Sequence, residues 1–266
     1  EVLGLQLGMG IELILEAWMF EFPFNDRGQF VAEFEELYFR YAAARYSPYR
    51  SIYLWNAANE YNFYRHTNHH HLHYDSITIK FAARLAKLIK DADPHGHPVG
   101  VHNFELNAPF KDKFRNIKEI DVLLFQHWGD QSTQRNKDLV AGIDARIEEN
   151  LHSSGKVNFM AEYGYEIYPG TGLSPRSHDG ITASHTRRGA WKSLFCGVHL
   201  ICGFENTWGA FLKTALDPEG ASQIIHLKRF FTENISFKDF RQNHGILVGN
   251  VEKPGENAQC MTNRDE

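Results

Sequence analysis

The chain has 266 residues, a formal net charge of −5 and 42% hydrophobic residues. These values fit a soluble globular protein, and without clustered Lys and Arg for phosphate contacts we expect no nucleic-acid partner. We also expect no membrane partner, because no segment reaches the ~18 consecutive apolar residues of a membrane span. The three cysteines form no CxxC pair, so they indicate neither a disulfide framework nor a redox compartment.

Short apolar runs alternate with segments of helical periodicity along the chain. The apolar runs predict strands and the amphipathic segments predict helices. In chain order we expect a strand at 10–18, a helix at 29–46, a strand at 50–60, a helix at 76–94, a strand at 97–104, a short helix at 111–117, a strand at 121–128, a helix at 134–152, a strand at 156–164, a helix at 183–198, a strand at 199–208 and a helix at 221–234.

Six consecutive strand–helix units predict the fold class. Near-continuous apolar strands that are each followed by a helix are typical of a parallel sheet buried on both faces. The chain carries no glycine fingerprint for dinucleotides and no Walker loop, which favours a (β/α)8 TIM barrel over an open sheet. We expect residues 1–235 to form such an α/β barrel without its first two strands, and residues 236–266 a β-like extension or the start of a small β-domain.

Polar and aromatic residues follow the apolar body of every predicted strand. The carboxyl ends of the strands carry the functional residues of a parallel barrel. The residues at these ends are Glu16, Trp18, Asn59, Glu60, His102, Asn103, His127, Trp128, Glu162, Tyr163, Glu205, Asn206 and Trp208. Glu60 and Glu162 lie three strands apart and can converge on the barrel mouth. Two facing carboxylates suit glycoside hydrolysis, in which one protonates the leaving oxygen and the other attacks the anomeric carbon.

Two strand-end segments carry a family resemblance. "WNAANEY" (55–61) and "FMAEYGY" (159–165) resemble the fourth- and seventh-strand motifs of clan A glycoside hydrolases, which are retaining (β/α)8-barrel enzymes. The segment "RRGAWKSLFCGVHLICGFENTW" (187–208) resembles the corresponding helix and eighth strand of apiosidase-like, family-5-related barrels. The resemblance covers roughly residues 10–235 and implies that strands one and two of the barrel are not in this chain.

The resemblance implies a role for each strand-end residue. Glu60 would be the general acid/base and Glu162 the nucleophile, while Asn59 would bind the sugar 2-hydroxyl and Trp208 would stack under the sugar. His127 and Tyr163 would orient or hydrogen-bond around the nucleophile. The remaining residues expected to line neighbouring subsites are Trp18, His102, Asn103 and Trp128. This chemistry needs a carbohydrate substrate but no metal or cofactor, and it does not indicate an oligomeric state.

Structural interpretations stay open beside these roles. The Asn-Glu pair could cap a helix, Glu162 and Glu205 could pair with basic residues, and the tryptophans could pack in the core. The stretch "YRHTNHHHLHYD" (64–75) holds five histidines, which would suit a transition metal, although no HExxH motif occurs. The alternatives to a retaining glycosidase are therefore a non-catalytic carbohydrate-binding barrel and a metal-dependent hydrolase. A polysaccharide substrate would place the protein outside the cytoplasm, secreted or periplasmic.

Overall fold

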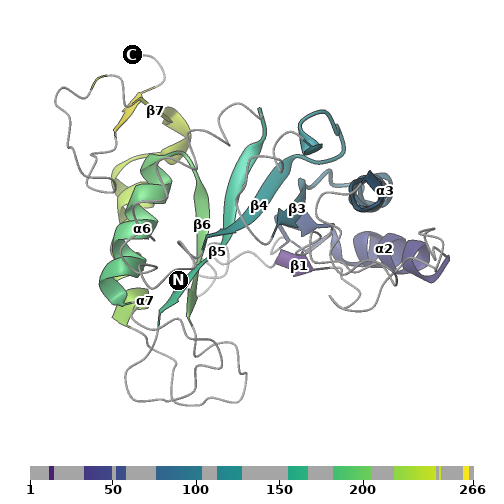
Figure 1. The fold of residues 1–266 in the computed structure, drawn as a ribbon, viewed down its shortest axis with the longest axis horizontal. Helices are drawn as coiled ribbons and strands as arrows, with labels where there is room; N and C mark the ends of the chain where they lie inside the picture. Colours follow the sequence, from purple (N-terminus) through teal and green to yellow (C-terminus); the bar gives the residue numbers. More distant parts are fainter. Residues whose placement is uncertain are drawn as a thin grey trace. The chain divides into compact units, whose positions relative to one another are not determined.

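The structure, a computed structural model, divides the chain into two compact units. The first contains residues 1–125 and 153–157, and the second contains residues 126–152 and 158–266. Figure 1 shows the elements of both units along the chain. The described residues are 12–14, 33–49, 52–57, 76–103, 113–127, 155–166, 182–204, 219–243, 246 and 260–263.

Four neighbouring parallel strands form the sheet of the first unit. They are β1 (Glu12–Ile14), β2 (Leu54–Asn56), β3 (Val99–Asn103) and β4 (Val122–His127), whose last two residues belong to the second unit. Every residue of β2 and β3 is buried. Burial of successive residues, which point to opposite faces, means that both faces of these strands are covered, as in an α/β protein.

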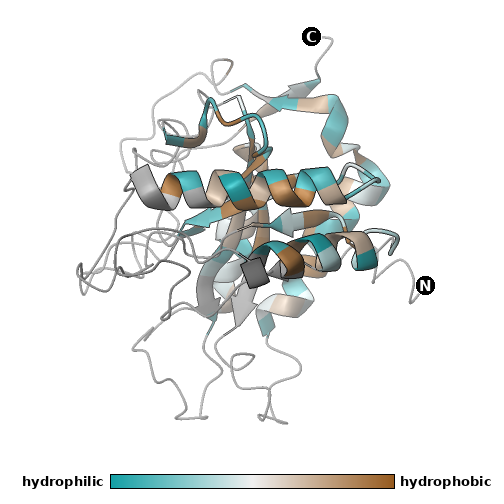
Figure 2. Cartoon of the chain, turned by 90° about the vertical axis from the view of Figure 1, so that its right-hand side faces the viewer, coloured by the Kyte–Doolittle hydropathy of each residue, from teal (hydrophilic) through white to brown (hydrophobic). Residues whose placement is uncertain are grey.

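Two helices complete the βα units of the first unit. Helix α2 (Glu33–Tyr46) follows β1, helix α3 (Ser76–Ala92) follows β2, and the two helices pack against each other. Figure 2 shows polar and apolar residues alternating along both helices. In α3 the buried residues recur at helical spacing. These buried residues are Ala82, Leu85, Ala86, Leu88 and Ile89.

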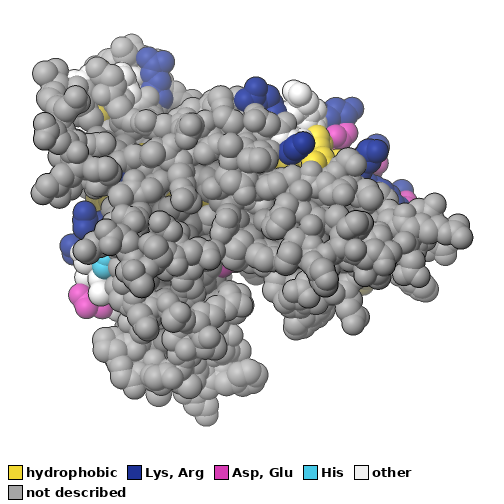
Figure 3. Space-filling view, in the orientation of Figure 1, with side chains coloured by type: hydrophobic (Ala, Val, Ile, Leu, Met, Phe, Trp, Pro, Cys, Tyr) yellow, Lys and Arg dark blue, Asp and Glu magenta, His cyan; other side chains and the backbone are white. Residues whose placement is uncertain are grey.

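Charged residues on the outer surfaces of α2 and α3 pair with one another. Arg40 and Lys87 form i,i+4 ion pairs with Glu36 and Asp91, and Arg84 of α3 reaches Glu36 of α2 at 3.1 Å. Figure 3 shows described Lys and Arg side chains close to Asp and Glu side chains on one face of the molecule. Exposed pairs of this kind contribute at most about 1 kcal/mol each, so packing and not these pairs holds the helices on the sheet.

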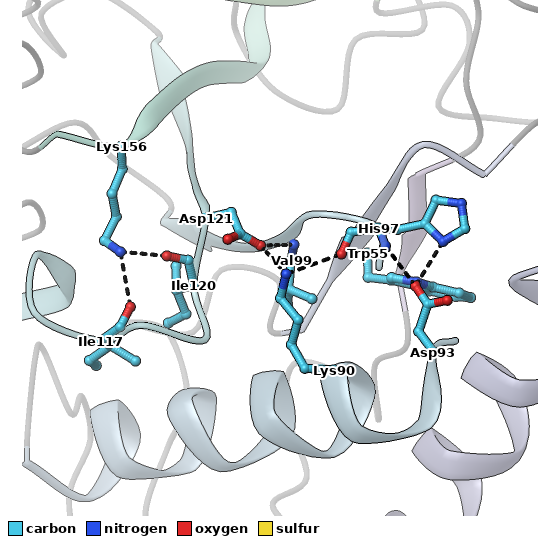
Figure 4. Close-up of polar contacts among 9 residues, drawn as sticks. All are labelled: Trp55, Lys90, Asp93, His97, Val99, Ile117, Ile120, Asp121 and Lys156. Atoms are coloured by element: carbon cyan, nitrogen blue, oxygen red, sulfur yellow. Dashed lines mark hydrogen bonds and ion pairs between the residues drawn. The ribbon is translucent and has the colours of Figure 1, made fainter. Parts of the chain in front are cut away.

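A polar cluster joins the amino-terminal ends of the strands in the first unit (Figure 4). The Asp121 carboxylate, just before β4, accepts the Val99 N–H of β3 at 2.8 Å and pairs with Lys90 of α3. The Lys156 ammonium donates to the carbonyl oxygens of Ile117, at 2.9 Å, and Ile120. In a parallel barrel this end of the strands serves stability, whereas function lies at the other end.

The second unit contains two parallel strands and the helices that cover them. Strand β5 (Val157–Glu166), which enters this unit at residue 158, pairs with β6 (His199–Phe204), and α6 (Ala183–Phe195) connects them. Helix α7 (Glu219–Arg229) packs against α6 and continues into a π-helical turn, Phe230–Asn234. Figure 1 shows α6 and α7 beside β6. The core between them is built from Ala190, Leu227 and Phe231, surrounded by Trp191, Leu194, Phe195, Leu200, Ile224, Phe230, Ile235, Phe237 and Met261.

A short antiparallel pair follows these helices. A 3₁₀ turn (Phe237–Asp239) leads into β7 (Phe240–Gln242), which pairs with β8 (Met261–Asn263). Phe237 and Met261 pack against the same core as α6 and α7. The predicted boundary between a barrel and an extension at residue 235 stays a prediction.

The predicted elements and the described elements agree in type and order. Each of the six predicted strands overlaps a strand of the structure, and β5 runs two residues beyond its predicted end at 164. Two segments differ in length or regularity. The predicted helix 111–117 is a helical turn at residues 113–116, and the predicted helix 221–234 is α-helical to Arg229 and π-helical beyond it. The predicted helix 134–152 lies outside the described residues.

Candidate active site

The predicted site residues that the structure describes lie on three strands. His102 and Asn103 end β3 in the first unit, and Glu162 and Tyr163 lie in β5 in the second unit. The backbone of His127 ends β4, but its side chain lies outside the description. The predicted residues and segments that fall entirely outside the described part of the chain are Trp18, Asn59, Glu60, Trp128, Glu205, Trp208 and the histidine-rich stretch 64–75.

Strand β5, which carries Glu162, pairs irregularly with β6. Met160 pairs with Leu200, Tyr163 with Cys202 and Glu166 with Phe204, so three-residue steps on β5 meet two-residue steps on β6. Each mismatch is a β-bulge, in which one extra residue is left out of the ladder and a side chain is re-aimed. Glu162 lies in the first of the two bulges. Bulges of this kind are common next to active sites.

The Glu162 carboxylate is held by a neighbouring amide. The Gln126 Nε2 group on β4 donates a hydrogen bond to Glu162 Oε1 at 2.9 Å. Gln126 is 1% exposed, whereas Glu162 is half-buried and keeps access to solvent. A donor to the carboxylate stabilises its ionised form and fixes its orientation. An ionised, oriented carboxylate that remains accessible is what a nucleophile at an anomeric carbon requires.

Gln126 is absent from the residues predicted to form the site. It is the first polar residue of the β4 sequence "VLLFQH", after four apolar residues, and this interruption is the signal that could have identified it. His127 and Trp128 were predicted instead because they lie closer to the end of the strand. The structure records a hydrogen bond from Gln126 to Glu162, whereas the side chains of His127 and Trp128 lie outside the described residues.

The side chain of Tyr163 lies toward the helices and is fully buried. Its hydroxyl donates to the His185 carbonyl oxygen of α6 at 3.0 Å. A Cβ placed on Gly189 of α6 would lie 1.9 Å from the Tyr163 hydroxyl oxygen, so the phenol fits against the helix backbone. The role expected of Tyr163 around the nucleophile stays a prediction.

His102 and Asn103 are also buried, with 2% and 0% of their surfaces exposed. Burial lowers the pKa of His102 from 6.5 to about 3, so its imidazole is neutral at ordinary pH. Close packing on this strand also excludes a side chain at Gly100, where a Cβ would lie 2.1 Å from Leu124 Cδ1. A subsite role for His102 and Asn103 stays a prediction.

Within the described residues, no group of three or more His, Cys, Asp and Glu side chains is arranged to hold a metal ion. Among the helices that these residues form, none combines the length and the apolar composition that crossing a membrane requires.

The sequence matches the family model described as "Apiosidase-like, catalytic domain" over residues 6–238. The chain belongs to this apiosidase-like family. The family is one of catalytic domains, which agrees with the predicted class of enzyme, and it confirms the resemblance carried by the strand-end motifs. A comparison with curated proteins finds no relative that matches.

The apiosidase-like chain is similar in fold to a solved glycoside hydrolase structure. A glycoside hydrolase family 5 protein from Bacteroides vulgatus ATCC 8482 matches with a TM-score of 0.63 and 18% identity, over 90% of this chain and 52% of that one. This likeness confirms the predicted (β/α)8 fold class, and the chain spans about half the length of that structure.

Two other solved structures match less closely. A putative glycoside hydrolase from Bacteroides vulgatus ATCC 8482 has a TM-score of 0.44 at 17% identity, over 64% of this chain and 27% of that one. A family 5 mannosidase from Rhizomucor miehei has a TM-score of 0.44 at 13% identity, over 64% of this chain and 45% of that one. Both TM-scores are too low to bear on the fold of this apiosidase-like chain.

Proposed function

We propose that this chain is a retaining glycoside hydrolase that cleaves a poly- or oligosaccharide by double displacement. The observation that carries the proposal is the half-buried Glu162 carboxylate in a bulge of β5, with the Gln126 amide donating to it at 2.9 Å. Membership in a family of catalytic domains supports an enzymatic role for this carboxylate.

In the first displacement, Glu162 attacks the anomeric carbon while the Glu60 carboxylic acid gives its proton to the glycosidic oxygen. The bond between the anomeric carbon and that oxygen breaks, and a covalent glycosyl ester forms on Glu162. In the second displacement, the Glu60 carboxylate takes a proton from water, whose oxygen attacks the same carbon and releases Glu162. Two inversions leave the anomeric configuration unchanged.

The surrounding residues would serve binding. Asn59 would hydrogen-bond the sugar 2-hydroxyl, and Trp208 would stack under the sugar ring. The Gln126 amide would keep Glu162 ionised before attack. The other proposed subsite residues are Trp18, His102, Asn103, His127 and Trp128. A polymeric substrate too large to enter a cell supports a secreted or periplasmic location for the protein.

Replacement of the two carboxylates tests the proposal. In Glu60→Gln we expect kcat to fall by about 10²–10⁴-fold, because general acid–base catalysis is lost. In Glu162→Gln we expect turnover to fall below detection, because an amide does not form the glycosyl ester. Both variants should keep their affinity for oligosaccharide, measured by calorimetry. Glu233→Gln, at an exposed position in the π-helical turn, is the control and should retain wild-type kcat.

The stereochemistry of the product is the second readout. Proton NMR at early times should show the product anomer with the configuration of the substrate. Inversion would contradict the retaining mechanism. Binding without turnover by the wild-type chain on a broad glycan panel would instead indicate a non-catalytic carbohydrate-binding barrel. Loss of turnover on adding a chelator, with activity kept in Glu162→Gln, would indicate a metal-dependent hydrolase.

A further inference from the structure

Three side chains of β5 share the face that looks toward α6 and α7. Leu200 of β6 packs against the core that these helices build. Met160 pairs with Leu200, and paired residues of neighbouring strands project to the same side of a sheet. Tyr163 and Glu166 project to that side as well, because they form hydrogen bonds with α6 and α7.

Tyr163 connects this face to α6. Its hydroxyl donates to the His185 carbonyl oxygen at 3.0 Å, and its ring occupies the space that a side chain at Gly189 would take. The phenol itself is fully buried. Any shift of β5 along α6 would separate the two groups and leave a buried hydroxyl without its acceptor, which is costly.

Glu166 connects the same face to α7. It is 5% exposed, and its Oε1 accepts the Gly220 N–H of the first turn of α7 at 3.0 Å. The first N–H groups of a helix lack helical acceptors and favour a negative charge nearby. A Cβ on Gly220 would lie 1.9 Å from Glu166 Oε2 and 3.0 Å from Thr186 Cγ2, so the carboxylate fits closely between the two helices.

We infer that Tyr163 and Glu166 are positioning residues that fix the bulged end of β5 on α6 and α7 and thereby orient Glu162. This inference rests on the proposed function, in which Glu162 is the nucleophile. A bulge leaves an extra residue outside the ladder, so strand pairing alone does not set the direction of the Glu162 side chain. The hydrogen bonds of Tyr163 to α6 and of Glu166 to α7 supply that constraint. The Glu162 carboxylate then lies where Gln126 of β4 donates to it.

Four substitutions test the inference. Tyr163→Phe removes the hydrogen bond to α6 and keeps the ring, and Glu166→Leu removes the acceptor for Gly220. Glu166→Gln is the conservative variant, because its amide oxygen still accepts the Gly220 N–H. Ser193→Ala is the matched control. Ser193 is buried on α6 and donates to the Gly189 carbonyl oxygen at 2.7 Å. The variant therefore loses a similar buried hydrogen bond, but one that does not involve β5.

The readouts are kcat and KM on the fastest-cleaved 4-nitrophenyl glycoside of a panel, together with Tm. We expect kcat to fall about tenfold in Tyr163→Phe and about 100-fold in Glu166→Leu, with KM within about twofold, because a misplaced nucleophile slows chemistry more than binding. Glu166→Gln should retain kcat within about threefold, and Ser193→Ala should lower Tm without lowering kcat. If Tyr163→Phe and Glu166→Leu lowered Tm as Ser193→Ala does and kept kcat, the inference would be wrong.

Crystal structures of the variants separate this inference from the proposed function. In Tyr163→Phe we expect the Glu162 carboxylate to move off Gln126, and retention of the 2.9 Å hydrogen bond would overturn the positioning role. That readout holds even if Glu162→Gln proves active, a result that would overturn the proposed function alone. If Glu166→Leu does not fold, the test is the comparison of kcat and Tm in Tyr163→Phe and Glu166→Gln with those in Ser193→Ala.

Discussion

At the scale of single residues, Gln126 holds the candidate nucleophile in place. Its side chain is buried in β4, and its amide donates to Glu162 Oε1 at 2.9 Å. A hydrogen bond to a charged group contributes about 1.5–3 kcal/mol. The residue therefore restricts the direction in which the Glu162 carboxylate points.

Gln126→Met tests this effect, because methionine has a similar volume but no donor. Without the hydrogen bond the Glu162 carboxylate is no longer held in one orientation, so we expect kcat to fall about tenfold with KM within about twofold. Steady-state kinetics at pH 7 measure both constants. The control is Gln223→Met, at a surface position on α7 where Gln223 accepts from Arg187. A wild-type kcat in Gln126→Met would show that Gln126 does not orient Glu162 for catalysis.

The sequence could predict Glu162 but not its surroundings. Glu162 lies near the end of the predicted strand 156–164, in a motif that resembles a known one, and both signals are local. Strict alternation would set Tyr163 on the face opposite Met160, yet the bulge between them puts both on the helix side. A bulge depends on how two strands pair, which the residues of one strand do not reveal. The burial of Tyr163 and its contact with α6 were therefore not predictable.

At the scale of elements, Asp93 joins β2, α3 and β3 (Figure 4). Asp93 follows α3, and its carboxylate accepts hydrogen bonds from Trp55 Nε1 at 3.0 Å, from the His95 N–H at 2.8 Å and from the His97 N–H at 3.0 Å. His97 Nδ1 lies 2.7 Å from the same carboxylate. Burial raises the pKa of Asp93, but the hydrogen bonds from Trp55, His95 and His97 outweigh it and hold the pKa below its ordinary value.

Asp93→Asn should destabilise the protein. The NH₂ group of the new amide would face N–H donors that now have a carboxylate oxygen as their acceptor. We expect a loss of about 2 kcal/mol in the free energy of unfolding at pH 7, measured by urea denaturation. Since the folded pKa is depressed, the stabilisation is present above the unfolded pKa of about 3.9 and is lost as pH falls through the folded pKa. The difference between variant and wild type should therefore shrink below about pH 4.

Asp91→Asn is the control for this prediction. Asp91 lies on α3 two residues away, and its side chain is 51% exposed in a surface pair with Lys87. Surface pairs of this kind contribute at most about 1 kcal/mol, so this variant should stay close to wild type. Equal losses in Asp91→Asn and Asp93→Asn would contradict the role assigned to the buried carboxylate.

Periodicity predicted the type and order of the elements but not where α-helical geometry ends. The segment "RFFTEN" (229–234) continues the helical pattern of α7, yet Phe230–Asn234 form a π-helical turn. The ring of Phe230 lies 5.3 Å from that of Trp191 on α6, and the ring of Phe231 lies 5.4 Å from that of Phe237. The contact with Trp191 comes from a residue distant in the sequence, so the local pattern does not record the change of geometry.

At the scale of the whole molecule, buried titratable groups couple stability to pH. His102 is 2% exposed, and burial lowers its pKa to about 3, against 6.5 for the exposed side chain. Between these two values the unfolded chain holds a proton on His102 that the folded chain does not. The folded state therefore loses stability as pH falls from about 6.5 toward 3, by up to about 1.4 kcal/mol per pH unit.

His102→Gln should flatten this dependence, since glutamine does not titrate. Urea denaturation at pH 7, 6 and 5 should give a free energy of unfolding that falls more steeply in the wild type than in His102→Gln, by about 1.4 kcal/mol per pH unit below pH 6. The comparison is between slopes, so any loss of stability that the substitution itself causes at pH 7 does not enter. His226→Gln, at an exposed position on α7, should keep the wild-type slope. Parallel curves for His102→Gln and the wild type would show that this imidazole is protonated in the folded protein, in conflict with its burial in β3.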